Sequence, residues 1–101
     1  MSFMEYHMKK YEVMTIAKSK LGEDGSINLS NSIKDMISSF GGKVLDNTFM
    51  GKRKLAYPLK GDSEAFYDVI NFELESGELG SLKTKLNLVD DLSRYLITAK
   101  K

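Results

Sequence analysis

The chain has 101 residues, of which 42% are hydrophobic and 29% charged, and a formal net charge of +1, which predicts one soluble globular domain rather than a disordered chain. No apolar run approaches the roughly 20 residues that a membrane-spanning helix needs, so no membrane partner is expected. The sequence has no cysteine, which excludes disulfides, thiolate metal sites and thiol catalysis.

Residues 1–8 are expected to form a flexible leader before a single domain over residues 9–101. The leader contains Glu5 and His7 and lacks the apolar stretch of a secretory signal, so a cytoplasmic location is expected. His7 is the only histidine of the chain. Without neighbouring ligand residues it is interpreted as an exposed terminal side chain rather than a metal or catalytic residue.

The first part of the domain predicts a strand and a helix. Residues 10–17 carry apolar side chains on both faces of an alternating pattern, as in a central strand. Residues 18–28 have turn chemistry around Glu23–Ser26 and are expected to be a connector. Ser26 or Ser30 is the candidate cap of the helix that follows, and Gly41-Gly42 would end it. Its apolar stripe is Leu29, Ile33, Met36, Ile37 and Phe40.

The remaining chain predicts three strands and a second helix. Residues 43–49 begin a strand that continues through Met50-Gly51, with a bulge at the glycine. After a turn at residues 60–64, residues 65–74 form the most apolar strand, which is expected to be central. Leucines at positions 79, 82 and 86 predict a helix capped by Ser76, and residues 92–98 predict the last strand after a loop at residues 87–91.

The resulting order, β-α-β-β-α-β, is typical of a ferredoxin-like fold in the α+β class. Right-handed crossovers would place both helices on one face of a four-stranded antiparallel sheet. In the expected strand order 4-1-3-2, the first and fourth strands are neighbours.

The densest positive charge lies in residues 51–60, Gly-Lys-Arg-Lys-Leu-Ala-Tyr-Pro-Leu-Lys. Because Pro58 cannot donate to a central ladder, this segment is expected at a sheet edge. Lys52, Arg53 and Lys54 could protect that edge from pairing with other chains, or they could hold phosphates. Alternation along the strand predicts that Arg53 faces opposite to Lys52 and Lys54, unless the glycine bulge turns them.

Two segments carry a family resemblance. Within residues 51–60, the spacing of Gly51, Arg53, Leu55, Ala56, Tyr57, Pro58 and Lys60 resembles the signature of the bacterial small-subunit ribosomal protein S-six family. Lys9-Lys10-Tyr11-Glu12-Val13 looks like the opening strand of that family. With Arg94, the resemblance covers residues 9–100, and the family has the same ferredoxin-like fold.

The resemblance implies a structural role in the small ribosomal subunit, without catalysis, cofactor or small-molecule substrate. It also implies binding to small-subunit ribosomal RNA as a heterodimer with ribosomal protein S-eighteen, the more basic partner. The candidate RNA-binding residues are Lys9, Lys10, Lys52, Arg53, Lys54 and Arg94. Because the first and fourth strands are neighbours, Lys9, Lys10 and Arg94 are expected to form one patch.

The sequence argues against an enzyme. It has no glycine-rich phosphate loop and no Cys or His pair at metal-ligand spacing, and the adjacent carboxylates Asp90 and Asp91 are interpreted as solvated loop residues. Some ferredoxin-like folds are acylphosphatases, which grip phosphate with an arginine after the first strand. Residues 18–22 hold no arginine, so this chain lacks that feature.

Two other functions stay open. RNA-recognition domains stack bases on sheet aromatics, and Tyr11, Phe66, Tyr67 and Phe72 occupy candidate positions. Asp68 and Glu73 would repel a phosphate backbone there, so these aromatics are interpreted as core and partner contacts. The other alternative is a stand-alone module that forms a homodimer through its sheet and binds a metabolite.

Overall fold

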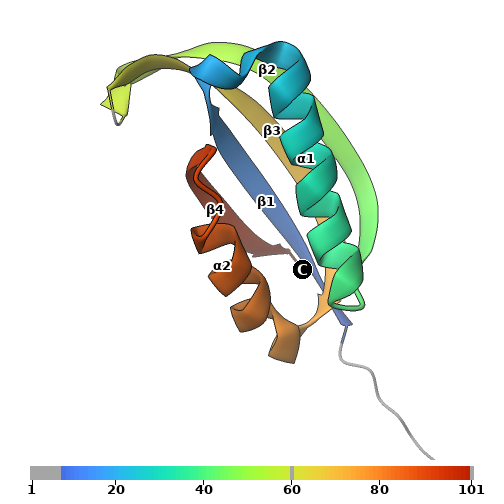
Figure 1. Cartoon of the computed structure of the whole chain (residues 1–101). Helices are drawn as coiled ribbons and strands as arrows, with labels where there is room; N and C mark the ends of the chain where they lie inside the picture. The colour runs from blue at the N-terminus through green and yellow to red at the C-terminus, as the bar shows by residue number, and fades with distance from the viewer. Residues whose placement is uncertain (1–7, 60, 101) are drawn as a thin grey trace, which may run out of the picture.

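The computed structural model describes residues 8–59 and 61–100. The strands are β1 (Met8–Lys18), β2 (Lys43–Leu59), β3 (Asp62–Glu75) and β4 (Leu92–Lys100). The helices are α1 (Gly22–Ser39) and α2 (Leu79–Asn87), preceded by the short 3-10 helices η1 (Ser19–Leu21) and η2 (Ser76–Glu78). The strands form one antiparallel sheet in the order β2-β3-β1-β4, and both helices cover the same face (Figure 1). The predicted ferredoxin-like fold and strand order are confirmed.

The expected leader falls almost entirely outside the described residues. Of residues 1–8 the structure describes only Met8, which begins β1 and pairs with Glu75. His7, and Lys60 of the basic stretch, also lie outside the described residues. The division into a leader and a domain over residues 9–101 therefore stays a prediction.

The core lies between the helices and the two central strands. Helix-facing residues of β1 and β3 are paired across the ladder, as Val13 is with Ile70 and Tyr11 with Phe72. The Tyr11 and Phe72 ring centroids lie 5.6 Å apart. Each fully buried aliphatic or aromatic side chain of this kind stabilises the fold by about 1.5–3 kcal/mol. The buried core cluster is Tyr11, Val13, Ile33, Ile37, Ile70, Phe72, Leu74, Leu82, Leu86 and Leu92.

Helix α1 begins earlier than predicted, because residues 22–28 are helical rather than a connector. Glu23 and Asp24 occupy its first turn, where negative charge is stabilised by the helix dipole. Ser26 does not cap the helix, since its hydroxyl lies 2.9 Å from the backbone oxygen of Glu23, within the helix itself. The predicted serine caps are wrong: the residue preceding each α-helix, Leu21 or Glu78, makes no side-chain capping bond.

Helix α1 ends at Gly41-Gly42, as predicted. Gly41 has φ +83°, and the Gly42 N–H donates to the Ile37 oxygen at 2.9 Å. A Cβ atom on Gly42 would stand 2.7 Å from Ile37 Cγ2 and 2.8 Å from the Glu73 oxygen. Only glycine therefore allows the chain to pass this closely from α1 into β2.

Alanine substitutions at two glycines should change stability in opposite directions. Gly42→Ala is expected to lower the free energy of unfolding by about 1–3 kcal/mol, because the added methyl group overlaps backbone atoms. Gly80→Ala, in α2 with nothing within 4 Å of the added carbon, is expected to raise it by about 0.5–1 kcal/mol. Urea unfolding of both variants checks this. Equal midpoints would contradict the close approach at Gly42.

Strand β2 is an edge strand with three register shifts against β3. Two are bulges that leave the exposed residues Leu45 and Met50 without a partner in the register. The second bulge adjoins Gly51 at φ +82°, which confirms the irregularity predicted there. At the third shift, residues 55–58 of β2 stand opposite Ser63 alone, since Lys54 pairs with Glu64 and Leu59 with Asp62. This excursion contains Pro58, which cannot donate to the ladder.

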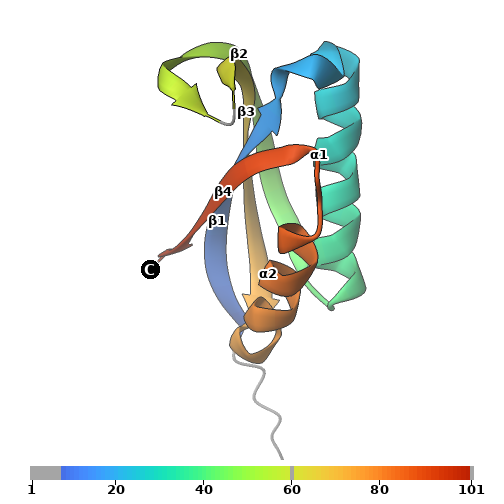
Figure 2. The ribbon, with the colours of Figure 1, turned by 60° about the vertical axis from the view of Figure 1, so that its left-hand side comes forward.

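The excursion and the hairpin turn form a protrusion that we call the arm, residues 55–59 and 61–62. Figure 2 shows the arm, in yellow-green at the top left, bending to the side of the sheet that the helices leave uncovered. The molecule therefore has a helix-covered face and an uncovered face, and the arm overhangs one end of the second.

Candidate nucleic-acid interface

The arm closes over a small cavity on the uncovered face of the sheet. The cavity has a volume of about 160 Å³ and is lined by Ile16, Leu55, Ala56, Tyr57, Tyr67 and Arg94. Tyr57 is 71% exposed, so its ring stands at the surface rather than in a core. Arg94 of β4 is thereby brought beside the arm, although it lies 32 positions after Asp62, the last residue of the arm.

Four of the predicted cations lie at this end of the sheet, and we call them the arm cluster: Lys52, Arg53, Lys54 and Arg94. Lys52 pairs with the helix-facing Phe66, and Arg53 with the next residue, Ala65, so successive cations point to opposite faces. Arg53 is therefore on the uncovered face, as Arg94 is. The alternation predicted from the sequence is confirmed, and the cations surround the base of the arm from both faces.

Most of the arm cluster makes no ion pair among the described residues. Only Lys52 has an ion pair among the described residues, at 3.9 Å from Glu64, and its ammonium also stands 5.9 Å from the Phe66 ring centroid. Such an exposed pair contributes at most about 1 kcal/mol. The Arg53 Nε–H donates to the Met50 oxygen at 3.3 Å, which ties this guanidinium to the bulge. Arg53, Lys54 and Arg94 keep their charge available to an anion.

Lys9 and Lys10 do not join Arg94, which corrects the single patch expected from the sequence. In the β1–β4 ladder Arg94 pairs with Ile16, whereas Lys10 pairs with Lys100. Six residues of strand separate Ile16 from Lys10, which is about 20 Å. Lys9, Lys10 and Lys100 instead line an open pocket at the opposite end of the sheet, and we call them the tail cluster. Lys100 was missed because β4 runs two residues beyond the predicted strand.

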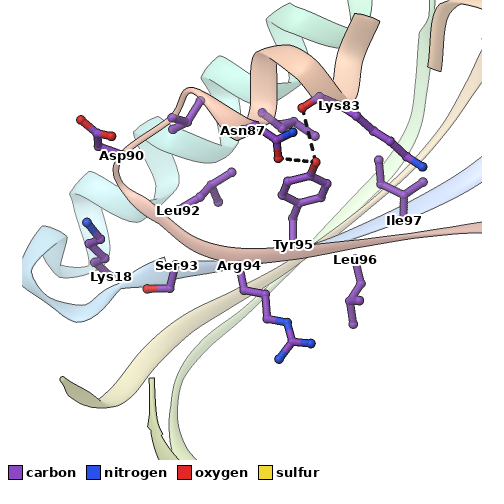
Figure 3. Close-up of a pocket in the computed structure, with 12 residues that line it drawn as sticks. Lys18, Lys83, Asn87, Asp90, Leu92, Ser93, Arg94, Tyr95, Leu96 and Ile97 are labelled. Carbon is purple, nitrogen blue, oxygen red and sulfur yellow. Dashed lines mark hydrogen bonds between the residues drawn. The ribbon is translucent and has the colours of Figure 1, made fainter. Parts of the chain in front are cut away.

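Strand β4 and helix α2 enclose a larger open pocket of about 580 Å³ (Figure 3). Tyr95 and Ile97 point toward α2, and the Tyr95 hydroxyl donates to Asn87 Oδ1 at 2.8 Å. Arg94 and Leu96 point to the other side of the strand, away from α2. The contact between Tyr95 and α2 therefore orients β4 so that Arg94 is presented on the uncovered face.

The sheet aromatics are placed to form a core rather than to stack bases. Of the four candidate aromatics, Tyr11, Phe66 and Phe72 are buried on the helix-covered side, and Tyr67 lies half-buried on the uncovered face. Asp68 is also buried on the helix-covered side, so it does not face a ligand on the uncovered face. The interpretation of Tyr11, Phe66 and Phe72 as core residues is confirmed.

Other kinds of site find little support in residues 8–59 and 61–100. In that part of the chain, no helix combines the length and the apolar character needed to cross a bilayer. No group of three or more His, Cys, Asp or Glu side chains there could hold a metal ion.

The family model for Ribosomal protein S6 matches residues 10–99. A small ribosomal subunit protein bS6 from Symbiobacterium thermophilum is 40% identical over 90 residues, covering 89% of this chain and 95% of the relative. The protein of the same name from Dictyoglomus turgidum is 37% identical over 91 residues, covering 90% of this chain and 94% of the relative.

Solved structures agree with these relatives. The crystal structure of 30S ribosomal protein S6 from Thermotoga maritima superposes with a TM-score of 0.87 at 28% identity, over 92% of this chain and 88% of that one. The C-terminal domain of the MgtC protein from Mycobacterium tuberculosis shares the fold alone, with a TM-score of 0.63 at 15% identity. The chain therefore belongs to the Ribosomal protein S6 family, the S-six family that residues 9–13 and 51–60 resemble, and its role is structural and non-enzymatic.

Proposed function

We propose that this chain is a constituent of the small ribosomal subunit that binds small-subunit ribosomal RNA together with ribosomal protein S-eighteen. Its location is then the cytoplasm, on the ribosome. The observation that carries the proposal is the arm cluster, in which Arg53, Lys54 and Arg94 converge on one end of the sheet with no ion pair among the described residues. Relatives that match almost their whole length are named small ribosomal subunit proteins, which supports the assignment.

The arm cluster suits a phosphate backbone better than a base sequence. Lysine and arginine bind RNA by neutralising phosphates and releasing counterions. Double-helical RNA is recognised through its shape, phosphates and 2′-hydroxyls, so a few well-placed cations are sufficient. Because the cations lie on both faces of β2, they could contact phosphates on two sides of the arm, as at the edge of an RNA groove or at a junction between RNA helices.

The uncovered face suits a protein partner. Leu96 is 52% exposed on this face, and Met14 and Val69, from β1 and β3, lie on it half-buried. Apolar side chains at the surface of a sheet face are typical of a protein contact rather than an RNA contact. A more basic partner seated there would add the positive charge that a chain of net charge +1 lacks.

Gel-shift assays with small-subunit rRNA test the proposal. We expect weak binding by this chain alone and tight binding when S-eighteen is added, because the arm cluster contributes only three cations without an ion pair among the described residues, which gives few phosphate contacts. The assays should be run at one fixed salt concentration, with S-eighteen alone as the control. Equally tight binding by this chain in the absence of S-eighteen would contradict the heterodimer.

A further inference from the structure

A buried carboxyl group lies between the sheet and α1. Asp68 on β3 is 3% exposed, and its Oδ1 accepts a hydrogen bond of 2.7 Å from Asn47 Nδ2 on β2. Its Oδ2 is buried without a hydrogen-bond partner among the described residues. Neither the core nor the arm cluster needs a carboxyl group at this position, which is costly to bury.

Asn47 connects three elements through its side chain. Its Nδ2 also lies 3.0 Å from the Val69 oxygen of β3, and its Oδ1 accepts a hydrogen bond of 3.3 Å from the Ser30 hydroxyl of α1. Ser30 is itself buried. This one amide therefore holds β2 against both the neighbouring strand and the helix above it.

Apart from Asn47, the segment is held against β3 by one exposed side-chain hydrogen bond, between Asp46 and Asn71, and by one large apolar side chain. Residues 46–49 pair regularly with β3, but a bulge flanks them on each side, at Leu45 and at Met50. The segment could slide by one residue if one bulge absorbed its extra residue and the other gained one. Such a slip turns every side chain of the segment to the other face. Phe49, stacked on Phe66 at 6.2 Å between centroids, is its only large apolar side chain on the helix-covered side.

We propose that the pair formed by the half-buried Asn47 and the buried Asp68 is a register lock for β2. A buried polar pair gives little net stability compared with apolar side chains of similar size, but it strongly disfavours arrangements that leave either partner unpaired. In a slipped register, Asn47 would leave the helix-covered side, and the Asp68 carboxylate would lose the one side-chain hydrogen bond that it makes among the described residues. The wild-type pairing of residues 46–49 is the one in which the two side chains are hydrogen-bonded to each other.

The lock also acts on the arm cluster, and this consequence rests on the proposed function. Residues 52–54 follow the second bulge directly. The register of residues 46–49 therefore determines the size of this bulge, and with it the face of the sheet to which the side chains of residues 52–54 point. Asn47 and Asp68 are then positioning residues: they keep Arg53 on the face that carries Arg94, without contacting RNA themselves.

The chain supplies a matched control pair on the opposite face. Asn71 Nδ2 donates to Asp46 Oδ1 at 2.7 Å, the same length as the buried bond between the same residue types on the same two strands. This pair is exposed, so water can replace either partner. Its removal is expected to leave the register of β2 unchanged.

The test compares two double variants by NMR. Asn47→Val with Asp68→Val is expected to fold, yet to show a second set of amide resonances for residues 45–54 and weakened cross-strand NOEs between Thr48 and Val69. Asp46→Val with Asn71→Val is expected to keep one set of resonances and the wild-type NOEs. A single wild-type register in the buried double variant would overturn the lock.

Single substitutions keep the test decisive if the buried double variant does not fold. Asp68→Asn retains an oxygen that can accept from Asn47 and is expected to keep one register, whereas Asp68→Ala is expected to show two. Identical registers in these two variants would overturn the lock. No RNA is present in these measurements, so their outcome is independent of the proposed function.

Gel shifts with S-eighteen and rRNA test the consequence for binding separately. Asp68→Ala, with its mixed register, is expected to lose affinity relative to Asp68→Asn. Equal affinities would overturn the positioning role while leaving the register measurement intact.

Discussion

Replacing Arg53, Lys54 and Arg94 together by glutamine is expected to lower the rRNA affinity of the heterodimer by about a hundredfold at physiological salt. These three side chains have no ion pair in the described part of the chain, so each can neutralise a phosphate. The slope of log K against log salt should fall by about two to three units, since each lost contact removes about 0.7–0.9. Fluorescence anisotropy over a salt series measures both quantities.

A matched variant separates local contact from net charge. Replacing Lys34, Lys83 and Lys85 by glutamine also removes three positive charges, but it removes them from α1 and α2 on the helix-covered side. It is expected to change the affinity much less, because phosphates on the arm side are farther than a Debye length of about 8 Å. An equal loss in the two triple variants would mean that rRNA responds to overall charge and that the arm cluster is not the contact.

Phe72→Ala is expected to lower the free energy of unfolding by about 3–5 kcal/mol. The Phe72 side chain is fully buried, packs 5.6 Å from the Tyr11 ring and lies in the centre of the core between sheet and helices. Because a domain of this size has a total stability of only about 5–15 kcal/mol, the variant would be close to unfolding at ordinary temperatures. Thermal and urea denaturation measure the loss.

Tyr57→Ala is the aromatic control for this prediction. Its ring is 71% exposed on the arm, so its removal should change stability by no more than about 0.5 kcal/mol. If RNA bases stacked on the sheet aromatics, Phe72→Ala would abolish binding while leaving the unfolding midpoint unchanged. That combination would contradict the assignment of Phe72 to the core.

The fold followed from patterns that depend only on local sequence. The alternating pattern correctly predicted strands β1 and β3. The apolar stripe correctly predicted helix α1, and the glycines at positions 41 and 42 correctly predicted its end. The predicted start of α1 was wrong because residues 22–26, Gly-Glu-Asp-Gly-Ser, are compatible both with a loop turn and with the first turn of a helix. Local composition does not distinguish these, whereas in the folded chain Ser26 and Ser30 are both buried and Ser30 is hydrogen-bonded to Asn47 of the sheet.

Which cations come together in the candidate site depends on the register between neighbouring strands, and the sequence of one strand does not determine that register. Alternation correctly separated Arg53 from Lys52 and Lys54, and Gly51 correctly marked a bulge. The pairing of Arg94 with Ile16 rather than with Lys10 depends on where β4 starts against β1, after a shift near Ser93. The direction in which the arm bends, and the burial of Asp68 beside Asn47, likewise arise only when distant strands meet.

Sedimentation of ribosomes in high salt tests the central claim most directly. If this chain is a constituent of the small subunit, it remains with the small-subunit fraction after a high-salt wash. Recovery of the chain in the supernatant, as a free homodimer, would contradict the ribosomal role and favour a stand-alone ferredoxin-like module instead.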